Sequence, residues 1–529
     1  LPISPQYSPN GKMILFTSTV YPDAFTDSTN KKIAEEKKKI KYKARVYTSF
    51  PISDWDHWLD EKQMHPFVQP IEQEAVAKDL FTVSDISTKE GFHFGGSMCW
   101  SNDGKDVVFS ASSNFNAAAY QNTYSNLYKV SVADGTITQL INDGNDYESP
   151  KFSSDGKYIF SLVSSYNNYK VYNLNKLVRY DWPSMQHRTL LADKLDRPIN
   201  AFIINDKNIY MSVEDQGNDK VCMVSDDGSN LEYITKINKG CFNGISVSQN
   251  NVPILTSTYE SAVMPPEVVR IQINSGEYTN MSNANTEKLA ALDLHEAESV
   301  WFTSSRGKKI KSLLIRPAGF NTLKKYPLFV LIHGGPASAW KDNWSYRWNS
   351  QLLAAPGYVL LQTDYTGSTG YGEKFSQDIQ YDPFKGPGDE INEAAADAIK
   401  KFSFIDESLQ VAGGASYGGH LANWLQATTT HYKCLISHAG LVNSESQWGT
   451  SDDYYNREVM NGGTPWMQTK TFKEQNPIRY AANFKTPMLV TIGEQDFRVP
   501  INNSIENWHV LQRLKIPSKL IVFPDANHW

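Results

Sequence analysis

The 529-residue chain has few cysteines, no long apolar run and no excess of basic residues. Its four cysteines show neither Cys-x-x-Cys spacing nor histidines placed to complete a zinc site. No stretch approaches the roughly 18 to 20 uninterrupted apolar residues of a membrane-spanning helix. The formal net charge of −6 gives no excess of positive charge with which to bind nucleic acid or an anionic membrane surface. We therefore expect a globular protein that has neither nucleic acid nor a membrane as its partner.

Two local features have both a functional and a simpler interpretation. Cys222 and Cys241 are close enough in sequence to form a disulfide within one small β unit, but we favour unpaired thiols. The lysine-rich segment from Lys31 to Arg45 is interrupted by Glu35 and Glu36. A run of mixed sign without an amphipathic pattern is usually a solvated face, and we favour that interpretation over contact with nucleic acid or a membrane.

A turn phrase recurs in the first part of the chain, up to about residue 295. It appears as Ser8–Lys12, Ser101–Lys105 and Ser153–Lys157, each followed by a run of β-forming residues, with a weaker echo at Ser225–Gly228. The Asn-Gly or Asp-Gly pair supplies the positive φ of a tight hairpin, and the run after it forms the next strand. The interval from Ser8 to Ser101 is about two repeats of 40 to 50 residues, and that from Ser101 to Ser153 is about one. Repeats of this length are typical of propeller blades. Residues 1–295 are thus predicted to form a β-propeller domain, whose blade number stays open.

The pattern changes near residue 296. Continuous apolar runs, which suit strands buried on both faces of a parallel sheet, now alternate with helical patterns, the clearest being Asp389 to Phe402. This alternation predicts a doubly wound sheet, in an α/β-hydrolase domain over residues 296–529. The fold class is therefore two-domain, an N-terminal β-propeller plus a C-terminal α/β-hydrolase. The expected strands of the second domain are Val300–Phe302, Lys311–Ile315, Tyr326–Ile332, Gly357–Gln362, Leu409–Gly413, Cys434–His438, Met488–Ile492 and Ser518–Phe523.

Ser416 is the expected nucleophile. It lies in Gly414-Ala-Ser-Tyr-Gly418, a Gly-x-Ser-x-Gly pattern between an expected strand and the helical stretch Gly419 to Ala427. In a nucleophile elbow, small residues permit the sharp strand-to-helix turn, and the helix N-terminus helps to stabilise negative charge. The five-residue pattern alone arises often by chance, so its position between a strand and a helix carries the prediction.

Asp496 and His528 are the expected acid and base. Each follows an expected strand, at the sheet edge where such folds place their sites. The order Ser, Asp, His is the one that α/β-hydrolases use, and a serine hydroxyl needs a base that an acid orients. Asp525 and Glu494 are rival acids in less favourable positions. A turn role for Asp496 and a loop role for His528 stay open as alternatives.

The segment His333-Gly-Gly-Pro336 directly follows the expected strand Tyr326–Ile332. Its paired glycines let the backbone approach a substrate, so the N–H of Gly335, together with that of Tyr417, is expected to hold the oxyanion of a tetrahedral intermediate. His333 is expected to be a structural hydrogen-bonding residue. The sequence contains no metal, nucleotide or flavin motif, and this chemistry requires no cofactor.

Several motifs of the second half form a recognisable set: His333–Pro336, Trp344–Asn349, Gly367–Gly372, Gly414–Gly419, Gly462–Trp466, Asp496–Pro500 and Asn527–Trp529. With them the chain resembles the prolyl-oligopeptidase superfamily of serine peptidases, in the branch of acylaminoacyl-peptidases and dipeptidyl-peptidase V. In the first half, Asp54-Trp-Asp-His-Trp58 resembles the Trp-Asp-x-Trp signature of dipeptidyl-peptidase V, to which the chain is most similar.

The resemblance implies a propeller that caps the catalytic domain, with a site between the two. It also implies the release of dipeptides from free N-termini of short peptides, with a small or hydrophobic residue before the cut. A secreted or periplasmic location is implied by the resemblance alone. The start, Leu1 to Pro5, has neither the charged lead nor the apolar core of a signal peptide, and a cleaved signal would leave such a start. The oligomeric state stays open, a homodimer included.

The chain departs from that family in three places. Relatives place a glutamate after the third blade phrase, where it holds the substrate's α-ammonium group, but Asn167–Asn175 contains no acid. Asp382–Asp389 also differs from the family's usual segment. Family members continue with a helix beyond the catalytic histidine, whereas the sequence given ends at Trp529, and whether the chain is complete stays open. Either another acid serves, or the activity is that of an acylaminoacyl-peptidase, oligopeptidase or carboxylesterase. An inactive propeller-based binding protein is a further alternative, against which the retained Ser416, Asp496 and His528 argue.

Overall fold

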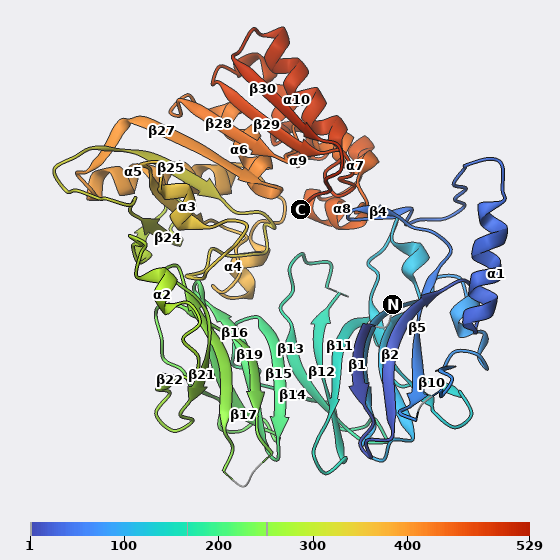
Figure 1. Ribbon diagram of the computed structural model, residues 1–529. Helices are drawn as coiled ribbons and strands as arrows, with labels where there is room; N and C mark the ends of the chain where they lie inside the picture. The colour runs from blue at the N-terminus through green and yellow to red at the C-terminus, as the bar shows by residue number, and fades with distance from the viewer. Residues whose placement is uncertain (1–2, 73, 167, 250–251) are drawn as a thin grey trace.

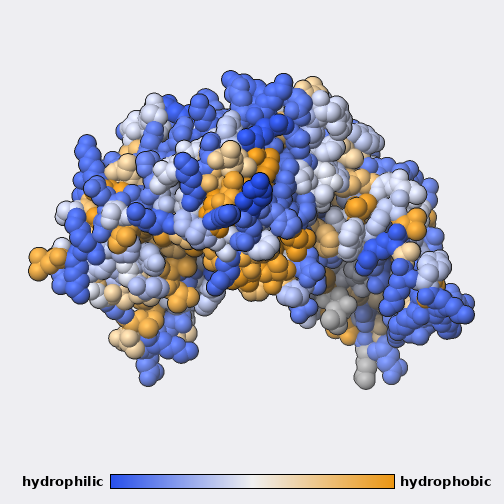
Figure 2. All heavy atoms as spheres, turned by 90° about the horizontal axis from the view of Figure 1, so that it is seen from above, coloured by the Kyte–Doolittle hydropathy of each residue, from blue (hydrophilic) through white to orange (hydrophobic). Residues whose placement is uncertain are grey.

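The computed structural model describes residues 3–72, 74–166, 168–249 and 252–529. A series of small antiparallel sheets is built from the first half of the chain, and one large mixed sheet with its helices lies above them (Figure 1). Seen from above, the surface is mostly hydrophilic, with apolar side chains gathered near its centre (Figure 2). None of the helices in the described ranges is both long and apolar enough to cross a membrane.

Within the described residues, the first half forms five four-stranded antiparallel sheets, which follow one another along the chain. Their strands are β1 (Ile3–Tyr7), β2 (Met13–Val20), β5 (Gln63–Pro70) and β6 (Lys78–Asp79); β7 (His93–Trp100), β8 (Asp106–Ser112), β9 (Ser125–Ser131) and β10 (Ile137–Gln139); β11 (Asn145–Phe152), β12 (Tyr158–Ser165), β13 (Lys176–Asp181) and β14 (Thr189–Leu191); β15 (Ile199–Asn205), β16 (Asn208–Asp215), β17 (Asn218–Ser225) and β18 (Glu232–Tyr233); and β19 (Cys241–Val247), β20 (Leu255–Ser261), β21 (Met264–Ile271) and β22 (Tyr278–Asn280). The other described elements of this half are α1 (Asp27–Lys38), the hairpin β3 (Ser53–Asp54) and β4 (His57–Trp58), η1 (Asp85–Thr88), η2 (Phe115–Ala117) and α2 (Thr286–Leu289).

Apolar clusters join each of these sheets to the next. Phe109 lies in the cluster between the first and second sheets, Tyr147 between the second and third, Phe202 between the third and fourth, and Phe242 between the fourth and fifth. Burying such rings removes the facing surfaces of neighbouring sheets from water, which holds the series together. In the described residues no comparable cluster joins the fifth sheet to the first. The sheets therefore form an open series, and the closed ring of a propeller is not shown.

The recurrent turn phrase forms the same hairpin in the first three sheets. Its glycines have positive φ, 68° at Gly11, 67° at Gly104 and 70° at Gly156, and each glycine N–H donates to the carbonyl of the phrase's serine. The serine hydroxyl in turn accepts the N–H of the residue after the lysine. In the fourth sheet the corresponding turn uses Asp206 at a φ of 51°, without glycine, so the repeat cannot be recognised there from the sequence.

The second half forms an eight-stranded sheet in the order β23-β24-β26-β25-β27-β28-β29-β30. Its first pairs, β23 with β24 and β24 with β26, are antiparallel, and every later pair is parallel. All the strands expected from apolar runs are found. They are β23 (Glu298–Thr303), β24 (Lys309–Ile315), β25 (Tyr326–Ile332), β26 (Val359–Asp364), β27 (Ile405–Ala415), β28 (Cys434–His438), β29 (Met488–Gly493) and β30 (Ser518–Phe523).

Helices pack against this sheet and bury its faces. The main apolar cluster of the second half includes Val330 and Ala412 of the sheet with Ile391, Leu421 and Leu511 of the helices. The helical elements are α3 (Ser350–Ala354), α4 (Glu373–Gln377), α5 (Lys385–Lys401), α6 (Tyr417–Thr428), α7 (Ser444–Thr450), α8 (Tyr455–Asn461), η3 (Pro465–Met467), α9 (Lys470–Glu474), η4 (Pro477–Asn483) and α10 (Ile501–Arg513).

Helix α5 begins at Lys385, ahead of the expected start at Asp389. Its first turn contains Pro387, which a helix tolerates there because the first N–H groups have no intrahelical partner. A Cβ on Gly388 would lie 2.6 Å from a ring carbon of Trp424 in α6. The unusual segment before Asp389 is therefore a helix start whose small residues let α5 approach α6.

The expected unpaired state of the cysteine pair is confirmed, and the lysine-rich segment is exposed where it forms a helix. Cys222 and Cys241 are buried free thiols on β17 and β19. Helix α1, which contains much of the lysine-rich segment, buries none of its residues. Its charges meet in exposed pairs such as Lys31 with Asp27, at 2.6 Å, as in a solvated face.

Candidate active site

Ser416 lies at the turn between β27 and α6, with φ of 58° and ψ of −123°. This strained conformation is that of a nucleophile elbow, and the Ser416 N–H fixes it by donating to the His438 carbonyl at 2.9 Å. The flanking glycines are required by space. A Cβ on Gly414 or Gly418 would lie 2.1 or 2.2 Å from the carbonyl oxygen of Ile332, at the end of β25. The Gly-x-Ser-x-Gly pattern is thus explained by the close approach of two strands and a helix.

Asp496 and His528 are brought together by the ends of β29 and β30. The His528 Nδ1 lies 2.7 Å from Asp496 Oδ2, and both side chains are buried. The other carboxylate oxygen of Asp496 accepts the backbone N–H groups of Arg498 and Val499, at 3.0 and 2.8 Å. These bonds fix the carboxylate, which in turn orients the imidazole ring.

The rival acids do not take this position. Glu494 and Asp525 are both exposed, and in the described structure neither forms a hydrogen bond with His528. The carboxylate that contacts the imidazole is therefore that of Asp496.

The His333-Gly-Gly loop lies against Ser416. A Cβ on Gly334 would lie 3.2 Å from the Cβ of Ser416 and 3.8 Å from its Oγ, and Gly335 has a φ of 119°. The His333 Nε2 lies 2.8 Å from Ser368 Oγ. The hydroxyl of Tyr365 donates to the His333 carbonyl at 2.8 Å. His333 thus has hydrogen-bonding partners of its own and holds the loop in place.

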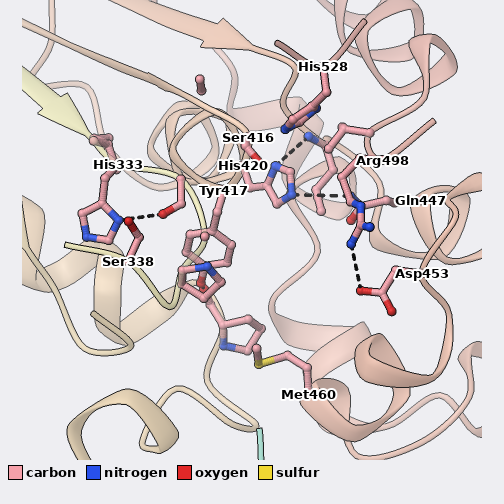
Figure 3. Close-up of a pocket in the computed structure, with 18 of the residues that line it drawn as sticks. His333, Ser338, Ser416, Tyr417, His420, Gln447, Asp453, Met460, Arg498 and His528 are labelled. Carbon is pink, nitrogen blue, oxygen red and sulfur yellow. Dashed lines mark hydrogen bonds and ion pairs between the residues drawn. The ribbon is translucent and has the colours of Figure 1, made fainter. Parts of the chain in front are cut away.

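A cavity of about 600 Å³ connects these residues. Ser416, Tyr417, Gly335 and His528 all line it, and Figure 3 shows the labelled side chains around it. No hydrogen bond joins Ser416 to His528 in the described structure, and catalytic hydrogen bonds are often long before substrate binds. The cavity thus brings together a serine and a carboxylate-bound histidine, and Gly335 and Tyr417 line it as well, an arrangement compatible with acyl transfer.

Other histidines near the cavity are unsuited to act as the base. Burial lowers the pKa of His333 and of His438 to about 4 each. Burial also lowers the pKa of His420 well below its usual range, and its Nδ1 accepts the Leu441 N–H at 3.0 Å. Of the described histidines that line the cavity, His528 alone is hydrogen-bonded to a carboxylate.

The hairpin β3–β4 extends from the first half of the chain to this site (Figure 1). Trp55 at its tip lines the cavity, with its ring centroid 5.5 Å from that of His528. The Trp55 N–H donates to Asp452 at 2.7 Å, and the Phe497 N–H donates to the Trp55 carbonyl at 3.0 Å. The motif Asp54–Trp58, noted only as a resemblance, therefore contributes Trp55 to the cavity wall.

Comparison with known proteins agrees with this geometry. Residues 344–529 match the model of the prolyl oligopeptidase family. The dipeptidyl-peptidase 5 of Schizosaccharomyces pombe is 28% identical, over 92% of this chain and 72% of the relative. That of Porphyromonas endodontalis is 25% identical, over 99% of this chain and 75% of the relative. The chain is a serine peptidase related to the prolyl oligopeptidase family.

A solved structure agrees with the fold of this peptidase. The acylaminoacyl peptidase of Pyrococcus horikoshii matches with a TM-score of 0.79 at 19% identity, over all of this chain and 78% of that chain. At this identity the likeness concerns the fold alone.

The peptidase cavity also contains charged residues that were not among the predicted site residues. Arg347, Arg457 and Arg498 line it together with one carboxylate, Asp453. Asp453 lies 3.5 Å from Arg498, an ion pair drawn in Figure 3. Only Arg347 and Arg498 fall inside motifs quoted for the family resemblance, so the sequence offered a signal for them but not for Arg457. Among its described residues the cavity wall thus carries more positive than negative charge.

Proposed function

We propose that the peptidase releases dipeptides from the free N-termini of short peptides, with a small or hydrophobic residue before the cut. The observation that carries this proposal is the buried Asp496–His528 pair, which shares one cavity with Ser416 at the junction of the two halves. The dipeptidyl-peptidase 5 names of the relatives support the substrate class. Apolar side chains on the cavity wall, among them Phe384 and Met460, suit a hydrophobic residue.

The mechanism follows from the roles that we assign to these residues. His528 takes the proton of the Ser416 hydroxyl as the oxygen attacks the scissile carbonyl, and Asp496 stabilises the imidazolium that forms. The N–H groups of Tyr417 and Gly335 hold the oxyanion of the tetrahedral intermediate. His528 then gives the proton to the leaving amine, and water hydrolyses the acyl-enzyme by the reverse sequence.

The domain layout is part of the same proposal. We assign residues 1–295 to a β-propeller domain and residues 296–529 to the α/β-hydrolase domain. The open series of four-stranded sheets supports the first assignment, and the eight-stranded sheet supports the second. A propeller that covers the cavity would admit short peptides and exclude folded proteins. A secreted or periplasmic location is proposed on the family resemblance.

A free N-terminus requires a carboxylate, because an unpaired ammonium group is costly to bury. Asn167 lies outside the described residues, and the rest of the segment to Asn175 contributes no acid. A second cavity of about 370 Å³ adjoins the first, and Tyr172 and Asn456 line both. Asp146 and Glu148 of β11 line this second cavity, and they are the carboxylates available for the α-ammonium group.

The alternative is an acylaminoacyl-peptidase, which cuts after a blocked N-terminal residue. The excess of positive charge on the main cavity favours it, because a blocked terminus carries no ammonium group. Matched peptides with a free or an acetylated N-terminus distinguish the two activities. We expect dipeptides from the free series and almost none from the acetylated series, as followed by mass spectrometry. Preferred cleavage of the acetylated series, or internal cuts in both, would establish the alternative.

Activity should fall towards acidic pH, because only neutral His528 can accept the Ser416 proton. Burial keeps His333 and His420 neutral there by lowering the pKa of each, to about 4 for His333. These two histidines should therefore add no limb of their own to the profile of kcat/KM. A profile that stays flat over roughly pH 5 to 8 would count against His528 as the base.

Asp364 can also shape this profile, because burial raises the pKa of its carboxyl to about 7. It lies behind the His333 loop and accepts the Trp340 N–H at 2.8 Å and the Tyr371 hydroxyl at 2.6 Å. The profile of Asp364→Asn separates the two groups. An acidic limb that persists in this variant does not arise from Asp364.

A further inference from the structure

Arg347 is a cation of the active-site cavity with little of its hydrogen-bonding capacity in use. In the described structure its guanidinium makes one hydrogen bond, from Nη2 to the carbonyl oxygen of His528 at 3.2 Å, and no ion pair. A guanidinium group has five N–H donors. Its side chain is exposed and lines the cavity, so the unused donors face a region that substrate enters.

The other cations of the cavity are engaged. Arg498 forms ion pairs with Asp452 at 2.8 Å and with Asp453 at 3.5 Å. Arg457 donates to Gln447 at 3.0 Å and to the hydroxyl of Ser451 at 3.1 Å. Among the described residues the Nε of Arg457 has no hydrogen-bond partner, but this side chain is partly buried, whereas Arg347 is exposed. Of the three described arginines, Arg347 is therefore the most accessible to an anionic group of the substrate.

Two indole rings hold the Arg347 guanidinium. It lies 5.4 Å from the ring centroid of Trp348 and 5.0 Å from that of Trp529. Trp529 is itself stacked on Trp55 at 5.0 Å. Cation–π contacts of this kind leave the edge of the planar group free, and the edge is what binds a carboxylate through two parallel hydrogen bonds.

The position of Arg347 relates it to the leaving part of the peptide. His528 must donate a proton to the leaving amine, so that amine lies beside the imidazole. Arg347 is hydrogen-bonded to the main chain of His528 and stacked on the residue after it. The carboxylate of a single leaving residue would lie next to the amine, whereas each further residue carries it about 3.3 to 3.6 Å onward.

We propose that Arg347 binds the C-terminal carboxylate of a leaving group one residue long, which makes the peptidase selective for tripeptides with a free C-terminus. This inference rests on the proposed function for the position of the cut. The contact is made in the bound substrate and in the transition state alike, so it acts on KM and not on kcat.

The test compares Ala-Phe-Ala as the free acid and as the C-terminal amide, with the tetrapeptide Ala-Phe-Ala-Ala in the same two forms. The tripeptide acid is expected to exceed its amide by about five- to tenfold in kcat/KM, through a lower KM. The tetrapeptide should show a much smaller ratio. Added salt should weaken the preference, because it screens an exposed pair.

Variants of Arg347 assign the preference. In Arg347→Gln the ratio of acid to amide should fall to about one, and Arg347→Lys should restore part of it because the charge returns. Arg45→Gln is the matched control, since Arg45 also lies over an indole ring, 5.6 Å from Trp58, but outside the cavity. Labelling of Ser416 by a fluorophosphonate shows in each variant that the site is formed.

Three outcomes would overturn the inference while leaving the proposed function intact: no difference between acid and amide in the wild type, an equal preference in the tetrapeptide, or a preference that survives Arg347→Gln. Failure of the proposed function is a different result. In that case the free-N-terminus peptides release no Ala-Phe dipeptide, and the assignment of Arg347 to this leaving position falls with it.

Discussion

Ser416→Ala is expected to lower kcat by about 10⁵- to 10⁶-fold while the protein stays folded. The substitution removes the oxygen that attacks the scissile carbonyl, and the remaining backbone N–H groups and binding contacts supply only residual catalysis. In the described structure the Ser416 hydroxyl forms no hydrogen bond with another residue, so the folded state loses little. The measurement is kcat on a dipeptide-releasing substrate, accompanied by circular dichroism and the melting temperature.

Ser408→Ala is the matched control, because Ser408 lies on the same strand, β27, and is exposed there. This control should retain wild-type turnover. Turnover of Ser416→Ala within tenfold of the wild type would refute the assignment of the nucleophile.

Asp496→Asn is expected to lower kcat by about 10⁴-fold with little loss of binding. The Asp496 carboxylate accepts from the Nδ1 side of His528 at 2.7 Å, which leaves Nε2 free to take the serine proton. An amide can instead donate to Nδ1, and the imidazole then carries its proton on the wrong nitrogen. The effect should appear in kcat, with KM almost unchanged.

The rival acids supply controls for this variant. Glu494→Gln and Asp525→Asn remove exposed carboxylates from the same two loops, and both variants should keep wild-type kcat. If Asp525→Asn lost as much kcat as Asp496→Asn, Asp496 could not be singled out as the acid that orients His528. Fluorophosphonate should label Ser416 slowly in Asp496→Asn and fast in both controls, because only the first variant loses the acid that orients His528.

The Trp55 hairpin shows why the first half matters for chemistry in the second. The Asn527 side chain donates to Asp56 at 2.9 Å, directly before His528. The Arg498 guanidinium lies 3.9 Å from the Trp55 ring centroid, and the backbone of Trp55 bonds to Asp452 and Phe497. The loops that hold His528 and Asp496 are therefore braced by a segment far away in the chain.

Much of the site was predictable because its residues lie at the ends of strands, and apolar runs in the sequence indicate where those strands end. Ser416 lies between an apolar strand and a helix, and both Asp496 and His528 follow continuous apolar runs. The carboxyl ends of parallel strands share one edge of a sheet, so local patterns imply that these residues lie close together. The catalytic roles themselves remain predictions until the variants are measured.

Other features had no local signal. The fourth and fifth sheets lack the glycine turn phrase between their first strands, and the order in which the sheets pack depends on apolar contacts between distant segments. The sequence also predicted a β-propeller. The structure shows its small four-stranded sheets as an open series and does not show a closed ring.

The sequence by itself determined the alternation of strands and helices, the glycines of the elbow and the order of serine, acid and base, because periodicity and turn chemistry act over a few neighbouring residues. Only the tertiary structure decided that Trp55 borders His528, that Cys222 and Cys241 remain unpaired, and that Arg347 keeps unused donors while Arg498 is paired. Those outcomes depend on which side chains meet across hundreds of residues. Burial and charge at such meeting points follow from the packed fold and not from spacing along the chain.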